Sequence, residues 1–129
     1  MRSVELDVEG DAVPAERLEF LVTIALATAD VRDGHLAVSF VDADAIAALN
    51  AEHRGRPQPT DVLSFPVDGA DPSVGPGERE LGDVVICPEH TVDLEEAVVH
   101  GVLHLVGMDH ETDDGEMLAL QHQLMSWTR

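Results

Sequence analysis

The sequence is poor in several residue types, and each shortage excludes a class of protein. Aromatic residues make up only 3% of the 129 positions, so we expect a core packed with aliphatic side chains. Cys87 is the only cysteine, which excludes an internal disulfide and gives no sign of an oxidising compartment. No apolar run reaches the roughly 18 residues that a membrane span needs. The first residues alternate apolar and acidic side chains, unlike a signal peptide, so we expect a cytoplasmic protein.

Basic residues are scarce as well. All seven are arginine, and they face 26 acidic residues, which gives a formal net charge of −19. A surface of this kind repels nucleic acid in general, because binding depends largely on lysine and arginine contacts with phosphate. We interpret it as a solvated acidic surface, produced by compositional drift or by adaptation to high salt. We therefore expect no DNA partner, and any RNA must be bound through a local positive field.

The hydrophobic pattern predicts one domain that spans residues 1–129. Strand patterns occur at 4–8, 36–40, 60–66 and 81–87. Helical patterns occur at about 14–30, after Asp42, at 94–106 and at about 113–127. The segment 81–87 is so continuously apolar that we place it inside the sheet. The predicted fold class is α+β, with a mixed sheet of about four strands packed with helices.

The predicted helix at 94–106 is the centre of this arrangement. Asp93 and Glu96 form an N-terminal capping signature, and the segment that follows is apolar nearly all round. A helix of this composition is expected to be buried on every side. Beyond its first turn, His100 and His104 are its only polar side chains.

These two histidines belong to a group of three. Residues four apart lie on one helix face, and Gly107 is a natural helix end that allows the chain to turn back and bring His110 beside them. Three imidazoles with a fourth position open are the ligand set of a catalytic zinc site. The alternative is a pair of core histidines hydrogen-bonded to backbone or carboxylates, which the spacing disfavours.

The spacing resembles the zinc-binding motif His-Glu-x-x-His-x-x-Gly-x-x-His of the metzincin peptidases. In those enzymes the residue after the first histidine is a glutamate that acts as general base. Here that residue is Gly101, which cannot transfer a proton. The pattern therefore predicts a metal site without the peptidase chemistry.

Four blocks in order resemble the bacterial YbeY family, rRNA maturation factors described as single-strand-specific endoribonucleases. The first is His-Gly-Val-Leu-His-Leu-Val-Gly-Met-Asp-His at 100–110. The second joins Arg54-Gly55 to Pro-Thr-Asp-Val-Leu-Ser-Phe-Pro at 59–66. The third is Leu-Gly-Asp-Val-Val-Ile-Cys-Pro-Glu at 81–89. The fourth is the order strand, helix, strand at the N-terminus.

The resemblance implies a zinc-dependent endoribonuclease with one ion per chain, involved in 16S rRNA 3′-end maturation and ribosome quality control. Its partners would be ribosomal RNA and proteins of the small ribosomal subunit. By this resemblance His100, His104 and His110 are the metal ligands. Three imidazoles also accept nickel, cobalt or copper.

The resemblance also makes Arg54 a catalytic residue that holds RNA phosphate, which suits a guanidinium because it pairs with phosphate through two donors. Arg56 lies nearby and is a candidate second RNA contact. Asp109 either orients a ligand imidazole or caps the turn. We expect the cleft between the C-terminal end of the histidine helix and the loop at 54–60.

Two other functions stay open at this stage. One is a ribosome-assembly factor whose metal is mainly structural. The other is a metallopeptidase-like hydrolase, against which Gly101 argues.

Overall fold

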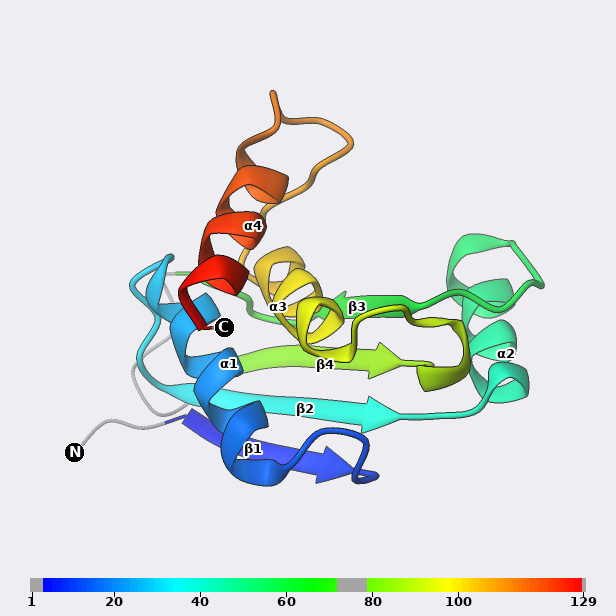
Figure 1. The fold of residues 1–129 in the computed structure, drawn as a ribbon. Coiled ribbons are helices and arrows are strands. Elements are labelled where there is room, and N and C mark those ends of the chain that lie inside the picture. The colour runs from blue at the N-terminus through cyan, green and yellow to red at the C-terminus, as the bar shows by residue number, and fades with distance from the viewer. Residues whose placement is uncertain (1–3, 72–78, 129) are drawn as a thin grey trace.

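The computed structural model describes residues 4–71 and 79–128, and its elements follow the predicted order (Figure 1). They are β1 Val4–Glu9, α1 Ala15–Ala27, β2 Gly34–Phe40, α2 Ala43–Arg54, β3 Val62–Pro66, β4 Glu80–Ile86, the short 3-10 helix η1 Pro88–His90, α3 Leu94–Leu105 and α4 Glu116–Thr128. Within these ranges no helix has the length and apolar character that a membrane crossing requires.

The strands form one mixed sheet in the order β1-β2-β4-β3. β1 pairs with β2 and β2 with β4 in parallel, whereas β3 runs antiparallel to β4. This confirms the predicted α+β class. It also confirms the interior position of β4, which explains why that segment is apolar on both faces.

Alternation along β4 divides the packing between the two faces of the sheet. Val84 and Ile86 join the main core, which α1 and α3 cover (Figure 1). Val85 and Cys87 point the other way and pack with Ile46 of α2 in a smaller cluster. The core is aliphatic, as the shortage of aromatic residues predicts.

Aspartates fix the starts of α2 and α4. Asp42 accepts a hydrogen bond from the Ala45 N–H at 2.8 Å, so it caps α2 as predicted. α4 begins at Glu116, three residues later than predicted. The physical reason lies in Gly115 and Asp113. Gly115 has a φ of +101°, which a right-handed helix cannot contain, and the Asp113 carboxylate accepts the N–H groups of Gly115 and Met117.

α3 lies unusually close to the sheet at Gly101. A Cβ atom added there would be 2.5 Å from Val84 Cγ1 and 3.3 Å from Val62 Cγ2. On the same side, the Ser64 hydroxyl of β3 donates a hydrogen bond to the Gly101 carbonyl at 2.9 Å. Gly101 therefore faces the sheet, and its lack of a side chain is what allows this approach.

The expectation that α3 is buried on every side is wrong for one face. Its apolar residues are buried, but His100 and His104 are only half-buried. The reason is that the histidine face of α3 lines a pocket and is left uncovered by the helices around it.

Candidate metal centre

Three histidines converge at the C-terminal end of α3. His100 and His104 lie one turn apart on the helix, and His110 lies on the turn that follows. The ring centroids are separated by 4.7 Å for the helical pair, and His110 lies 5.0 Å from His100 and 5.2 Å from His104. One nitrogen from each ring lies within 4.8 Å of the other two. The structure thus brings together the three predicted ligands.

The way α3 ends explains the position of His110. The Met108 N–H bonds to the Leu103 carbonyl at 3.1 Å, and the Gly107 N–H bonds to the His104 carbonyl at 3.0 Å. These two bonds form a Schellman motif, in which the residue after the helix cap is left-handed. Gly107 takes that position with a φ of +100°, where a side chain would add strain. The predicted helix stop is confirmed.

The ring geometry fits a metal ion. The Nε2 atoms of His100 and His104 lie 3.2 Å apart. Zinc–nitrogen bonds of about 2.0–2.1 Å in a tetrahedral site place ligand nitrogens roughly 3.3–3.4 Å apart. Within residues 4–71 and 79–128, no fourth histidine, cysteine or carboxylate belongs to the cluster. A set of three protein ligands is typical of catalytic zinc sites, whereas structural sites have four.

The protonation state also favours metal binding. The pKa of His104 is lowered, chiefly by burial and then by the neighbouring charges of His100 and His110. A hydrogen bond with the Met108 backbone and the charge of Asp109 oppose this shift. A lowered pKa keeps the ring neutral at pH 7, and a neutral imidazole is the form that binds a metal.

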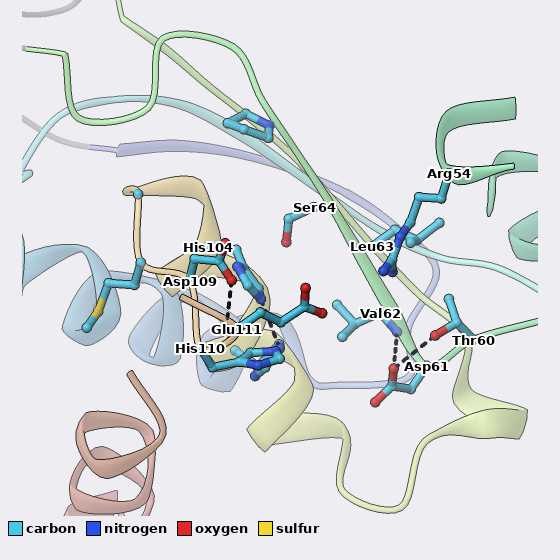
Figure 2. Close-up of a pocket in the computed structure, with 14 residues that line it drawn as sticks. Arg54, Thr60, Asp61, Val62, Leu63, Ser64, His104, Asp109, His110 and Glu111 are labelled. Carbon is cyan, nitrogen blue, oxygen red and sulfur yellow. Dashed lines mark hydrogen bonds between the residues drawn. The ribbon is translucent and has the colours of Figure 1, made fainter. Parts of the chain in front are cut away.

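The histidines form one wall of a pocket of about 510 Å³ (Figure 2). Its other walls come from β3 and from the residues just before that strand. The pocket is lined by Arg54, Thr60, Asp61, Val62, Leu63, Ser64, Pro66, His100, His104, Gly107, Met108, Asp109, His110 and Glu111. This is the place predicted for the cleft, between the end of α3 and the loop at 54–60.

Arg54 is the last residue of α2 and extends into this pocket (Figure 2). Gly55 ends the helix with a φ of +69°, and buried Asn50 fixes the loop that follows by donating to the Gln58 carbonyl at 2.9 Å. Within the described part of the chain, Arg54 forms no ion pair. Its guanidinium is therefore available to an anion.

Arg56 differs from Arg54 in position. It is exposed and is not among the pocket residues. Its backbone N–H donates to the Asn50 carbonyl at 3.3 Å, so its main chain helps to close the loop. The structure does not bring its side chain into the candidate site.

Asp109 lines the pocket and caps the turn. Its Oδ1 accepts the Glu111 N–H at 2.9 Å, and its carbonyl accepts the Thr112 N–H at 3.2 Å. Of the two roles considered for Asp109, the turn cap is the one with a hydrogen bond in the structure.

The family model of endoribonuclease YbeY matches residues 7–128. The chain belongs to the YbeY family. Two relatives named "Endoribonuclease YbeY" illustrate the likeness. The one from Nocardia farcinica is 38% identical over 95% of this chain and 78% of its own length. The one from Rubrobacter xylanophilus is 45% identical over 76% of this chain and 70% of its own.

A solved structure shares this fold. The solution structure of TM1509 from Thermotoga maritima superposes with a TM-score of 0.58 at 29% sequence identity. The match covers 95% of this chain and 87% of that one. The resemblance inferred from four sequence blocks is therefore confirmed.

Sequence reasoning missed three residues of this YbeY-family site. Asp61 and Glu111 add carboxylates to the pocket, and Gln121 of α4 contacts His100, with 2.7 Å between Gln121 Oε1 and His100 Nδ1. Glu111 could have been suspected from its place next to His110. A signal for Gln121 was present too, because it is a polar residue on the buried stripe of α4 that Met117 and Leu124 define.

Proposed function

We propose that this chain is a zinc-dependent endoribonuclease that cleaves single-stranded RNA. We further propose that it acts on the 3′ end of 16S rRNA and in ribosome quality control, in the cytoplasm and together with proteins of the small ribosomal subunit. The observation that carries the proposal is the shared pocket, in which three convergent imidazoles face the Arg54 guanidinium, which has no ion-pair partner among the described residues. The YbeY relatives are named endoribonucleases, which supports the same reaction.

Each part of the pocket has a distinct task in this proposal. His100, His104 and His110 would hold the ion, whose chemistry when bound is to polarise a phosphoryl oxygen and to lower the pKa of water to about 7. Arg54 binds the phosphate through two parallel N–H donors. Because it stays charged at any working pH, it also offsets the negative charge that develops on the phosphorus oxygens in the transition state.

Charge explains why RNA binding would depend on the metal. The described pocket residues include three carboxylates, from Asp61, Asp109 and Glu111, but one guanidinium. Without an ion this lining is formally negative and repels phosphate, whereas a divalent cation brings it to neutrality. In a chain of net charge −19, the ion and Arg54 together would supply the local positive field.

The decisive experiment compares metal-loaded wild type with His104→Ala on a labelled single-stranded RNA, a duplex RNA and a peptide. We expect cleavage of the single strand by wild type, its loss in His104→Ala, and no peptide hydrolysis. His122→Ala is the matched control, because His122 is exposed on α4 and lies outside the pocket. Equal RNA cleavage by wild type and His104→Ala would reveal a contaminating nuclease and contradict the proposal.

The same experiment addresses the alternative of an assembly factor with a structural metal. In that case, the metal-loaded protein would not cleave RNA, and removing the ion would only lower the melting temperature. The three-ligand cluster favours the catalytic reading, because a structural site would use a fourth protein ligand.

A further inference from the structure

Gln121 is the one polar residue on the inner face of α4. Met117, Leu124 and Met125 share that face and are buried with it, and the Gln121 residue is only 9% exposed. A buried amide that found no partner would cost roughly 1–3 kcal/mol. Its carbonyl oxygen lies 2.7 Å from Nδ1 of His100, a short hydrogen bond for this pair of groups.

This contact fixes the protonation of His100. An amide oxygen can only accept a hydrogen bond, so Nδ1 must carry the proton. The second ring nitrogen, Nε2, then keeps its lone pair, and it lies 3.2 Å from Nε2 of His104. The contact thus selects the tautomer that presents a lone pair where the three histidines converge.

We propose that Gln121 is a positioning residue that holds His100 in its metal-binding tautomer and ring orientation. The inference rests on the proposed metal-dependent function, because it assigns a partner to one of the three ligands. Metal-bound histidines usually donate their other N–H to such an acceptor, and losing that acceptor typically costs 10–100-fold in metal affinity.

An amide suits this position better than a carboxylate. A carboxylate there would add negative charge beside a pocket that already holds Asp61, Asp109 and Glu111. A neutral acceptor orients the ring without adding that charge.

α4 is capped at its N-terminal end and tied to α1 at its C-terminal end, which supports the position of Gln121. At the N-terminal end, the Asp113 carboxylate accepts the Met117 N–H at 2.9 Å. At the C-terminal end, Arg17 of α1 donates to the Thr128 carbonyl at 3.1 Å and to Glu95 of α3 at 2.8 Å. α4 is therefore clamped to the helix that carries His100.

The first test uses the metal-free wild-type chain. Long-range ¹H–¹⁵N spectra of its histidines, with the His100 signals identified through a His100→Gln variant, should show His100 protonated on Nδ1. In Gln121→Leu this preference should weaken, while the His110 signals stay in place. A wild-type His100 protonated on Nε2 would overturn the proposal.

The second test measures zinc affinity by competition with a chromophoric chelator. Gln121→Leu should bind zinc 10–100-fold more weakly, whereas Gln121→Glu, which keeps an acceptor, should retain the affinity. Gln123→Leu is the matched control, because Gln123 is exposed on the same helix. Wild-type affinity in Gln121→Leu would contradict the proposal, as would equal losses in Gln121→Leu and Gln121→Glu.

These measurements separate the inference from the proposed function. A chain that binds zinc as described but cleaves no RNA would refute the nuclease and leave the role of Gln121 intact. A wild-type chain that binds no zinc would refute the metal-dependent function, and the tautomer of its metal-free His100 would still decide whether Gln121 orients the ring.

Discussion

Arg54 is the one arginine of the described chain that lines the pocket. Arg17 pairs with Glu95, and Arg32 pairs with Asp30, whereas Arg54 has no carboxylate partner in the described chain and lines the pocket. A guanidinium left unpaired in a chain of net charge −19 is exposed to any anion that enters. Under the proposed function, we therefore expect Arg54 to bind the phosphate.

Replacing Arg54 by alanine should lower kcat for RNA cleavage by about 100-fold, the usual effect of losing one preorganised donor. Zinc affinity should not change, because Arg54 is not a ligand. Arg54→Lys should recover only part of the rate, since lysine keeps the charge but not the planar pair of donors. Arg32→Ala is the control. Full activity in Arg54→Ala would remove Arg54 from the mechanism.

The missing side chain of Gly101 affects both the chemistry of the site and the packing of α3. Unlike the glutamate at this position in metzincins, Gly101 has no group that can transfer a proton. The structure shows that it also faces the sheet at a distance no side chain could tolerate. Because Gly101 has no side chain, the site lacks a general base at this position and α3 can pack close to the sheet.

Gly101→Ala should destabilise the fold by roughly 1–3 kcal/mol, the usual cost of overpacking a core. The added Cβ would lie 2.5 Å from Val84 Cγ1, so α3 must move outward and carry His100 and His104 with it. Denaturant unfolding measures the loss. In a double-mutant cycle, Val84→Ala should offset part of it, and additive effects would show that this contact is not the cause.

Between elements, His35 of β2 links three strands of the sheet. Its Nε2 lies 2.7 Å from Asp7 of β1, and its Nδ1 lies 2.7 Å from Glu80 of β4. Hydrogen bonds with Asp7 and then Glu80 raise the pKa of His35, and burial opposes them only in part. The protonated ring is thus favoured in the folded state.

The sign of the pH effect follows from this raised pKa. The stabilisation is fully present below the unfolded pKa of about 6.5 and is lost as the pH rises through the folded pKa. The free energy of unfolding of wild type should therefore exceed that of His35→Gln most at about pH 5.5 and least at about pH 8.5. A difference that stays constant over this range would rule out the charged form of His35.

The sequence predicts elements better than it predicts the contacts between them. Local signals sufficed for the helix that ends at Gly107 and for the start of α2 at Asp42, because caps and turns act within a few residues. The interior position of β4 followed from its apolar pattern, but the identity of its neighbours, β2 and β3, depends on contacts distant in sequence that local patterns do not encode. Gln121 was missed for the same reason, since its partner lies 21 residues away on another helix.

Across the whole molecule, the acidic surface is the dominant electrostatic feature. A net charge of −19 on 129 residues creates self-repulsion that destabilises the compact state. Dissolved salt shortens the range of this repulsion, because the Debye length falls from about 10 Å at 0.1 M to about 3 Å at 1 M.

The melting temperature should therefore rise as potassium chloride is increased from low to molar concentration, as expected for adaptation to high salt. Scanning calorimetry or fluorescence at several salt concentrations measures it. A flat response would contradict salt adaptation and leave compositional drift as the reading of the acidic surface.

The contact of Gly101 in α3 with Ser64 in β3 bears on how the substrate preference of this site can change between relatives. Two of the three candidate metal ligands stand on a helix that packs against β3 and β4, whereas Arg54 stands at a helix end beside an exposed loop at 55–59. Under the proposed function, we expect sequence change in that loop to alter which RNA is accepted without moving the three histidines. Exchanging residues 55–59 between relatives should therefore change the preferred cleavage sequence and leave the zinc affinity unchanged.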